Sequence, residues 1–106
     1  MSGARERLCA LAELEPGTAR RVDVADRRLA VVRIDDDVYV VGDRCTHQDI
    51  SLSEGEVLAD ERQIECWKHG SAFSLETGAP SALPATKATP VYDVEVVDGD
   101  VWVTLP

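Results

Sequence analysis

Long apolar runs and cysteines are both scarce in this chain, and each scarcity excludes a class of protein. The longest uninterrupted apolar stretch covers only residues 8–12, whereas a membrane-spanning helix needs about 20 such residues and a secretory signal core about 7–15. The three cysteines, Cys9, Cys45 and Cys66, are an odd number, which argues against a disulfide framework. We therefore expect a cytoplasmic protein with no membrane partner, whose thiols are available to bind metal.

Basic residues are also few. The chain has 11 Lys and Arg against 20 Asp and Glu, and its formal net charge is −9. This balance disfavours nucleic acid and anionic membranes as partners and suits docking on basic proteins, although it is also an ordinary way to keep a protein soluble. Residues 43–76 alone hold eight acids against three bases. The length of 106 residues and the 44% hydrophobic content are typical of a single globular domain, and we expect a monomer.

Alternating apolar and polar residues at both ends of the chain predict short antiparallel strands. One hairpin is predicted over residues 29–41 with its turn at Asp35-Asp36, and a strand is indicated before it, over residues 22–24. A second hairpin is predicted over residues 92–105, because Asp98-Gly99 is a strong two-residue turn signal. The pattern predicts an all-β protein, a small antiparallel sandwich or barrel.

The middle of the chain, residues 42–90, has weaker periodicity and contains four glycines and three prolines. One short strand is indicated there, over residues 63–66. A long irregular segment in a compact domain is usually functional, so we expect the functional site in this part of the chain.

Both histidines of the chain follow a cysteine closely, in Cys45-Thr46-His47 and in Cys66-Trp67-Lys68-His69. Each segment therefore offers one thiolate and one imidazole. Two such loops facing each other can give a cysteine pair to one iron and a histidine pair to its neighbour. Neutral imidazoles in place of two thiolates remove negative charge from one iron, so an added electron goes there more easily. The spacing is thus compatible with a two-iron centre.

These segments resemble the motif of the Rieske [2Fe–2S] proteins, in which Cys-x-His is followed, here after 18 residues, by Cys-x-x-His-Gly. Residues 70–78, Pro84-Ala85 and the closing Asp98-Gly99 turn are similar as well, so the resemblance spans about residues 8–105. It implies the Rieske fold in one domain over residues 1–106. A cluster-binding subdomain, about residues 42–82, would be inserted into a basal β subdomain formed by about residues 8–41 and 83–106.

The resemblance also implies the ligands. Cys45 and Cys66 would bind the buried iron, whereas His47 and His69 would bind the outer iron and leave their other ring nitrogens near solvent. Such an exposed imidazole edge is a natural exit for an electron.

Other residues receive roles around the cluster by the same resemblance. The segment that ends at Pro80 would match the proline-containing loop that covers the cluster. Ser71 is the first candidate to donate a hydrogen bond to the bridging sulfides, and Thr46 and Gln48 are further candidates. Trp67 would shield the cluster or guide electrons, although ordinary packing or surface exposure explains it equally well.

The chain departs from the Rieske proteins of the respiratory and photosynthetic complexes. Those carry an extra cysteine in each loop, where this chain has Ile50 and Lys68, and a tyrosine donor, where it has Phe73. A hydroxyl that donates a hydrogen bond stabilises the reduced cluster, so its absence lowers the potential. We therefore predict a midpoint potential in the lower half of the roughly −150 to +300 mV range of Rieske centres. A complete Rieske oxygenase subunit is excluded, since no histidine remains to hold its mononuclear iron.

Similarity to stand-alone Rieske ferredoxins implies a soluble single-electron carrier with no catalytic residues. It would take electrons from a flavin-dependent NAD(P)H ferredoxin reductase and pass them to a terminal non-heme iron oxygenase of a dioxygenase system. Similar ferredoxins are encoded beside iron–sulfur assembly genes, which leaves another electron acceptor open. A structural zinc module with two Cys and two His ligands fits the mixed pairs poorly. The intact ligands argue against a cluster-free domain such as some nitrite reductase small subunits.

Several other residues have simpler interpretations. Cys9 is predicted to be a buried strand residue rather than a ligand. The run Asp35-Asp36-Asp37 is predicted to be a solvated turn rather than a cation site. Trp102 is expected to pack within the last hairpin, and Lys68 to be a solvated loop lysine rather than a contact to an acidic partner.

Overall fold

The structure, a computed structural model, describes residues 4–24, 26–43, 51–66, 71–80 and 88–105. The strands formed by these residues are arranged in two antiparallel sheets, and two short 3-10 helices lie between strands. In chain order the elements are β1 (Ala4–Ala10), η1 (Leu11–Glu13), β2 (Thr18–Val24), β3 (Arg27–Ile34), β4 (Asp37–Gly42), η2 (Leu52–Glu54), β5 (Glu56–Leu58), β6 (Gln63–Glu65), β7 (Ala72–Ser74), β8 (Val91–Val97) and β9 (Asp100–Leu105).

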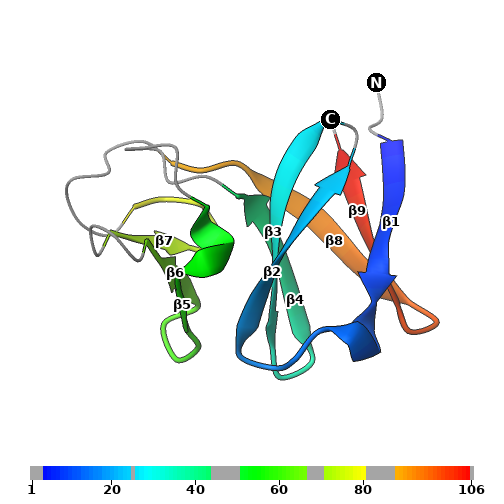
Figure 1. Ribbon diagram of the computed structural model, residues 1–106, viewed down its shortest axis with the longest axis horizontal. Helices are drawn as coiled ribbons and strands as arrows, with labels where there is room; N and C mark the ends of the chain where they lie inside the picture. Colours follow the sequence, from blue (N-terminus) through cyan, green and yellow to red (C-terminus); the bar gives the residue numbers. More distant parts are fainter. Residues whose placement is uncertain (1–3, 25, 44–50, 67–70, 81–87, 106) are drawn as a thin grey trace.

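The larger sheet joins the two ends of the chain. Its strand order is β1-β9-β8-β4-β3-β2, and it curls like an open barrel (Figure 1). Both predicted hairpins are present, with Ile34 opposite Asp37 across one turn and Val97 opposite Asp100 across the other. The second turn has positive φ at both Asp98 (51°) and Gly99 (80°), as a type I′ hairpin turn requires. The all-β prediction is confirmed for the described residues.

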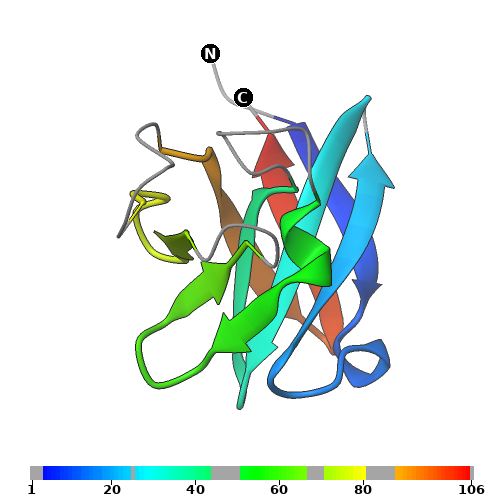
Figure 2. The same cartoon turned by 60° about the vertical axis from the view of Figure 1, so that its left-hand side comes forward.

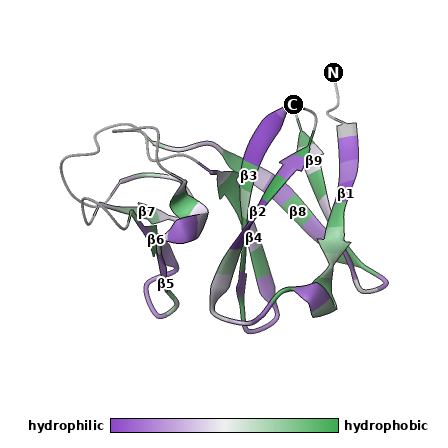
Figure 3. Cartoon of the chain, in the orientation of Figure 1, coloured by the Kyte–Doolittle hydropathy of each residue, from purple (hydrophilic) through white to green (hydrophobic). Residues whose placement is uncertain are grey.

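The central strands β3 and β4 are buried on both faces. One face packs inside the curled sheet against β1 and β9, for example through Leu29 and Val40. The other face, which includes Val32 and Val41, packs against the small sheet. Figure 3 shows hydrophobic (green) and hydrophilic (purple) residues along the strands of the larger sheet. We call the curled sheet the platform, because the small sheet packs on its outer face.

The small sheet, in the order β5-β6-β7, forms a separate layer on this platform. All three of its strands come from the chain between β4 and β8, so the layer is an insertion in the larger sheet (Figures 1 and 2). Of these strands, sequence patterning indicated only the one that begins at Gln63. Gly55 permits close packing at its edge, because a Cβ there would lie 1.7 Å from the carbonyl oxygen of Glu65. The subdomain boundaries near residues 42 and 82 stay a prediction.

Within the described ranges, no helix is long and apolar enough to cross a membrane.

Candidate metal centre

The second Cys-His segment starts at the end of strand β6. Glu65 is paired with Ala72 of β7, and directly after it the N–H of Cys66 donates a hydrogen bond to the carbonyl of Ser71 at 2.7 Å. These pairings place Cys66 and Ser71 opposite each other at the end of the β6–β7 hairpin. The Cys66 residue itself is fully buried.

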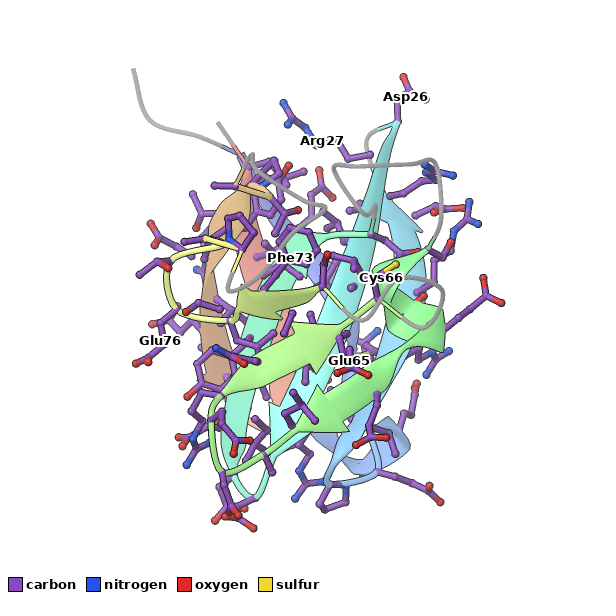
Figure 4. All side chains as sticks on the ribbon, turned by 90° about the vertical axis from the view of Figure 1, so that its left-hand side faces the viewer. Asp26, Arg27, Glu65, Cys66, Phe73 and Glu76 are labelled. Atoms are coloured by element: carbon purple, nitrogen blue, oxygen red, sulfur yellow. The ribbon has the colours of Figure 1, made fainter. Side chains whose placement is uncertain are left out.

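The surroundings of Cys66 fit the inner ligand of a metal cluster. The thiol lies in an apolar cluster with Leu52 of η2, Ile64 of β6 and Phe73 of β7, against the outer face of β3 and β4. Figure 4 shows Cys66 at the end of β6, next to the ribbon of η2. A thiolate is a good ligand for iron in clusters, and an apolar shell keeps water away from the site.

The first Cys-His segment is fixed at both of its ends. Before it, the N–H of Gly42 donates to the carbonyl of Pro90 at 2.9 Å, and the N–H of Asp43 donates to the carbonyl of Arg28 at 3.0 Å. After it, Ser53 in η2 donates its N–H to Oδ1 of Asp43 at 2.6 Å. The ends of this segment are therefore held between the platform and η2.

The proline segment is attached to the same hairpin. Pro80 forms a β-bridge with Phe73, and the N–H of Ser74 donates to the carbonyl of Ala79 at 2.9 Å. Gly78 has φ +78°, and a Cβ on it would lie 2.0 Å from the carbonyl oxygen of Thr89. Only glycine fits this turn, which holds Pro80 beside the strand that follows the second Cys-His segment.

Charges around the site are mixed. Asp43 is buried, so the acidic segment contributes one fewer surface charge than its sequence indicates. Glu56 of β5 stands directly opposite Glu65 of β6, and like charges in this position repel. On the platform side, Asp26 and Arg27 lie at the tip of the β2–β3 hairpin (Figure 4).

Three of the predicted site residues are described, and the structure brings them into one unit. Cys66 and Ser71 lie opposite each other at the end of the β6–β7 hairpin, and Pro80 is bridged to β7. The other predicted residues lie outside the described residues, so the ligand set stays a prediction: Cys45, Thr46, His47, Gln48, Trp67 and His69. Among the described residues, no group of three or more His, Cys, Asp or Glu side chains could hold a metal ion.

The remaining sequence interpretations can be compared with the structure in part. Cys9 is a buried residue of strand β1, in the core cluster inside the curled sheet, as predicted. Asp35 and Asp36 form the exposed turn between β3 and β4, and Trp102 lies in β9, under the guanidinium of Arg5 at 5.1 Å. Lys68 and Ile50 lie outside the described residues.

Sequence reasoning missed two buried polar residues next to the site, Asp43 and Thr89. The hydroxyl of Thr89 donates to the carbonyl of Gly42 at 3.3 Å, and its N–H donates to the carbonyl of Gly78 at 2.9 Å. Thr89 thus links the start of the first Cys-His segment to the proline segment. The only signal in the sequence was that Asp43 lies two positions before Cys45.

The profile of the Rieske [2Fe-2S] domain matches residues 5–93 of the chain. The chain belongs to this family. Ferredoxin CarAc of Metapseudomonas resinovorans is 45% identical over 98 residues, which are 92% of this chain and 90% of that protein. As a Rieske protein similar to ferredoxins, the chain holds one [2Fe–2S] cluster and carries electrons, and it is not itself the catalytic component.

Solved structures agree with this assignment. The ferredoxin of carbazole 1,9a-dioxygenase from Nocardioides aromaticivorans has a TM-score of 0.93 at 34% identity, and the match covers 97% of this chain and 99% of that one. A complex of reduced oxygenase and oxidized ferredoxin in carbazole 1,9a-dioxygenase contains a chain with a TM-score of 0.86 at 44% identity, covering 94% of this chain and 92% of that one. The Rieske fold predicted from the sequence is therefore confirmed.

Proposed function

We propose that Cys45 and Cys66 hold the inner iron of the Rieske cluster and that His47 and His69 hold the outer iron. The bound cluster supplies one-electron redox chemistry. The protein, a cytoplasmic monomer, accepts single electrons from a flavin-dependent NAD(P)H ferredoxin reductase and delivers them to the terminal non-heme iron oxygenase of a dioxygenase system.

The burial of Cys66 carries the ligand assignment. Its thiol is enclosed between the small sheet and the platform, which suits a ligand to an iron shielded from water. His69 is three residues further along the chain, and three extended residues span about 10 Å. That reach is enough to place the imidazole on the outer side of a cluster held at Cys66, while the thiolate stays inside.

The oxygenase partner is supported by the relatives. The similar ferredoxin in the carbazole 1,9a-dioxygenase complex is seated on an oxygenase, and the net charge of −9 suits a basic docking surface on a partner. A ferredoxin that serves iron–sulfur cluster assembly is the second candidate, because the same fold and ligands would serve either acceptor.

Metal analysis and two single substitutions test the ligand assignment. We expect about two irons and two sulfides per chain, against one zinc ion for a structural zinc module. His47→Ala and His69→Ala should each abolish the coloured cluster or alter its spectrum strongly. Cys9→Ala, which changes a thiol in the other core cluster, is the matched control and should leave the cluster spectrum unchanged. An unchanged spectrum in both histidine variants would refute the proposal.

Stopped-flow spectroscopy tests the electron acceptor. The reduced protein is mixed anaerobically with the oxidised terminal oxygenase of a carbazole dioxygenase, and oxidation of its cluster is followed. We expect oxidation that accelerates with oxygenase concentration and slows as ionic strength rises, since opposite charges on the two proteins speed their encounter. A rate that is independent of oxygenase would favour the assembly-linked alternative.

A further inference from the structure

We propose that Asp43 is a positioning residue for the first ligand loop: its carboxylate closes the loop at its base and thereby holds Cys45 and His47 in place. This inference rests on the ligand assignment proposed above. It concerns a residue that neither binds the metal nor touches a partner protein in the proposed function.

The hydrogen bonds of Asp43 place it at the base of the loop. Its backbone N–H donates to the carbonyl of Arg28 in β3 at 3.0 Å, which fixes the residue to the platform. Its Oδ1 accepts the N–H of Ser53, ten positions further along the chain, at 2.6 Å. The segment between Asp43 and Ser53 contains the complete Cys-x-His motif, so this single bond turns that segment into a closed ring.

The far side of the ring is anchored beside the second ligand loop. Leu52, the residue before Ser53, is fully buried in the same apolar cluster as Cys66. Fixing Ser53 therefore fixes η2 against the thiol of the second loop. Through this connection Asp43 relates the positions of the two loops to each other, and a cluster shared between them requires such a relation.

The burial of the carboxylate argues that its role is specific. The side chain of Asp43 is 0% exposed, and within the described ranges its Oδ2 accepts no hydrogen bond. The Nε of Arg21 lies 3.9 Å from Oδ2 but is closer to Asp23, at 3.0 Å. Removing a carboxylate from water is unfavourable unless its partners compensate. An apolar side chain at position 43, directly after β4, would avoid this cost, but it could not accept the hydrogen bond from the N–H of Ser53.

Paired substitutions at the two ends of the bond test the inference. Asp43→Ala removes the acceptor, and Ser53→Pro removes the donor, since proline has no N–H. The matched controls keep the bond: Asp43→Asn retains an amide oxygen at the acceptor position, and Ser53→Ala retains the backbone N–H. All four are purified anaerobically with the cluster bound, and the bleaching of the visible absorbance is followed in the presence of an iron chelator.

We expect Asp43→Ala and Ser53→Pro to lose the cluster at least about tenfold faster than the wild type, which is the scale of one buried hydrogen bond. Asp43→Asn and Ser53→Ala should stay within about threefold of the wild type. The electron paramagnetic resonance spectra of the reduced Asp43→Ala and Ser53→Pro proteins should be shifted or broadened, whereas those of the two controls should match the wild type. Wild-type behaviour of Asp43→Asn, which keeps the acceptor oxygen but has no charge, would show that the hydrogen bond and not the negative charge holds the loop.

Two results would overturn the inference. One is wild-type cluster retention and spectra in both Asp43→Ala and Ser53→Pro, and the other is cluster loss in Asp43→Asn as fast as in Asp43→Ala. Should Asp43→Ala fail to fold, Ser53→Pro against Ser53→Ala decides the question alone. These results are distinct from failure of the proposed function, in which the wild-type protein itself would lack a cluster with mixed ligands.

Discussion

Arg62 and Asp37 form an ion pair between the two layers of the protein, with Nη1 of Arg62 3.4 Å from Oδ2 of Asp37. Arg62 lies in the turn between β5 and β6, whereas Asp37 begins β4 of the platform. The guanidinium also lies 6.0 Å from the ring centroid of Tyr39. This contact supplements the apolar packing between the small sheet and the platform.

We predict that Arg62→Ala lowers the free energy of unfolding by about 1 kcal/mol. The pair is partly exposed and is worth little by itself, but the substitution also removes the cation–π contact and the packing of the arginine stem. Urea unfolding of the cluster-bound protein measures the change. Asp36→Ala, at a carboxylate that is 96% exposed, is the control and should change stability by less than about 0.5 kcal/mol.

Gly55→Ala should be among the most damaging small substitutions in the chain. Its Cβ would lie 1.7 Å from the backbone oxygen of Glu65, so β5 and β6 would have to separate, and we expect a loss of about 3 kcal/mol or more. Gly17→Ala is the comparison, because nothing lies within 4 Å of its Cβ. At position 17 the only cost is that alanine must adopt the positive φ of 81°, which we expect to be about 1–2 kcal/mol. Equal losses in thermal or urea unfolding would contradict this account of β5.

Phe73 provides a test of the predicted low potential. It is fully buried in the same apolar cluster as Cys66. It carries no hydroxyl, whereas the Rieske proteins of the respiratory complexes have a tyrosine donor at the corresponding position. We expect Phe73→Tyr to raise the midpoint potential by about 60 mV, if one hydrogen bond favours the reduced cluster by about 1.4 kcal/mol. Ser71→Ala should shift the potential in the opposite direction. Protein-film voltammetry checks both signs, and a wild-type potential near the top of the Rieske range would count against the account.

Cys9 should make the free energy of unfolding decrease as the pH becomes alkaline. Burial raises the pKa of the Cys9 thiol above its ordinary value, so the unfolded chain loses this proton before the folded one does. The contribution of the protonated thiol to the free energy of unfolding is present in full below the ordinary pKa of about 8.5. It is lost as the pH rises through the raised pKa of the folded protein. The stability difference between the wild type and Cys9→Ala should therefore narrow when urea unfolding is repeated between pH 7.5 and pH 10. A constant difference would show that the thiol keeps its proton equally well in both states.

The two hairpins of the larger sheet could be predicted from the sequence because their signals are local, whereas the extents of β1 and β2 could not. The Asp98-Gly99 turn and the alternating residues around it specify a hairpin without reference to any other part of the chain. Strands β5, β6 and β7 have only three residues each, and the sequence indicated only β6. Strands β5 and β7 show no alternating pattern of their own and are held by pairing with β6 and by burial of side chains such as Phe73.

The site could be predicted only where the chemistry of a residue type is specific. Paired Cys and His residues indicate a metal centre by their identity and spacing. The burial of Asp43 gave no such signal, because an aspartate between Gly42 and Arg44 looks like one more surface acid until η2 is folded against it. Its bond to Ser53 depends on the placement of the small layer on the platform, which is a tertiary property.

The spectrum of the dithionite-reduced protein tests the central claim, mixed Cys and His ligation of one [2Fe–2S] cluster, most directly. Electron paramagnetic resonance should give a rhombic signal whose average g value lies below that of all-cysteine [2Fe–2S] clusters, because imidazole ligands localise the added electron on the histidine-bound iron. A signal with the average g value of an all-cysteine cluster, or a protein that contains one zinc ion and gives no signal, would contradict the account.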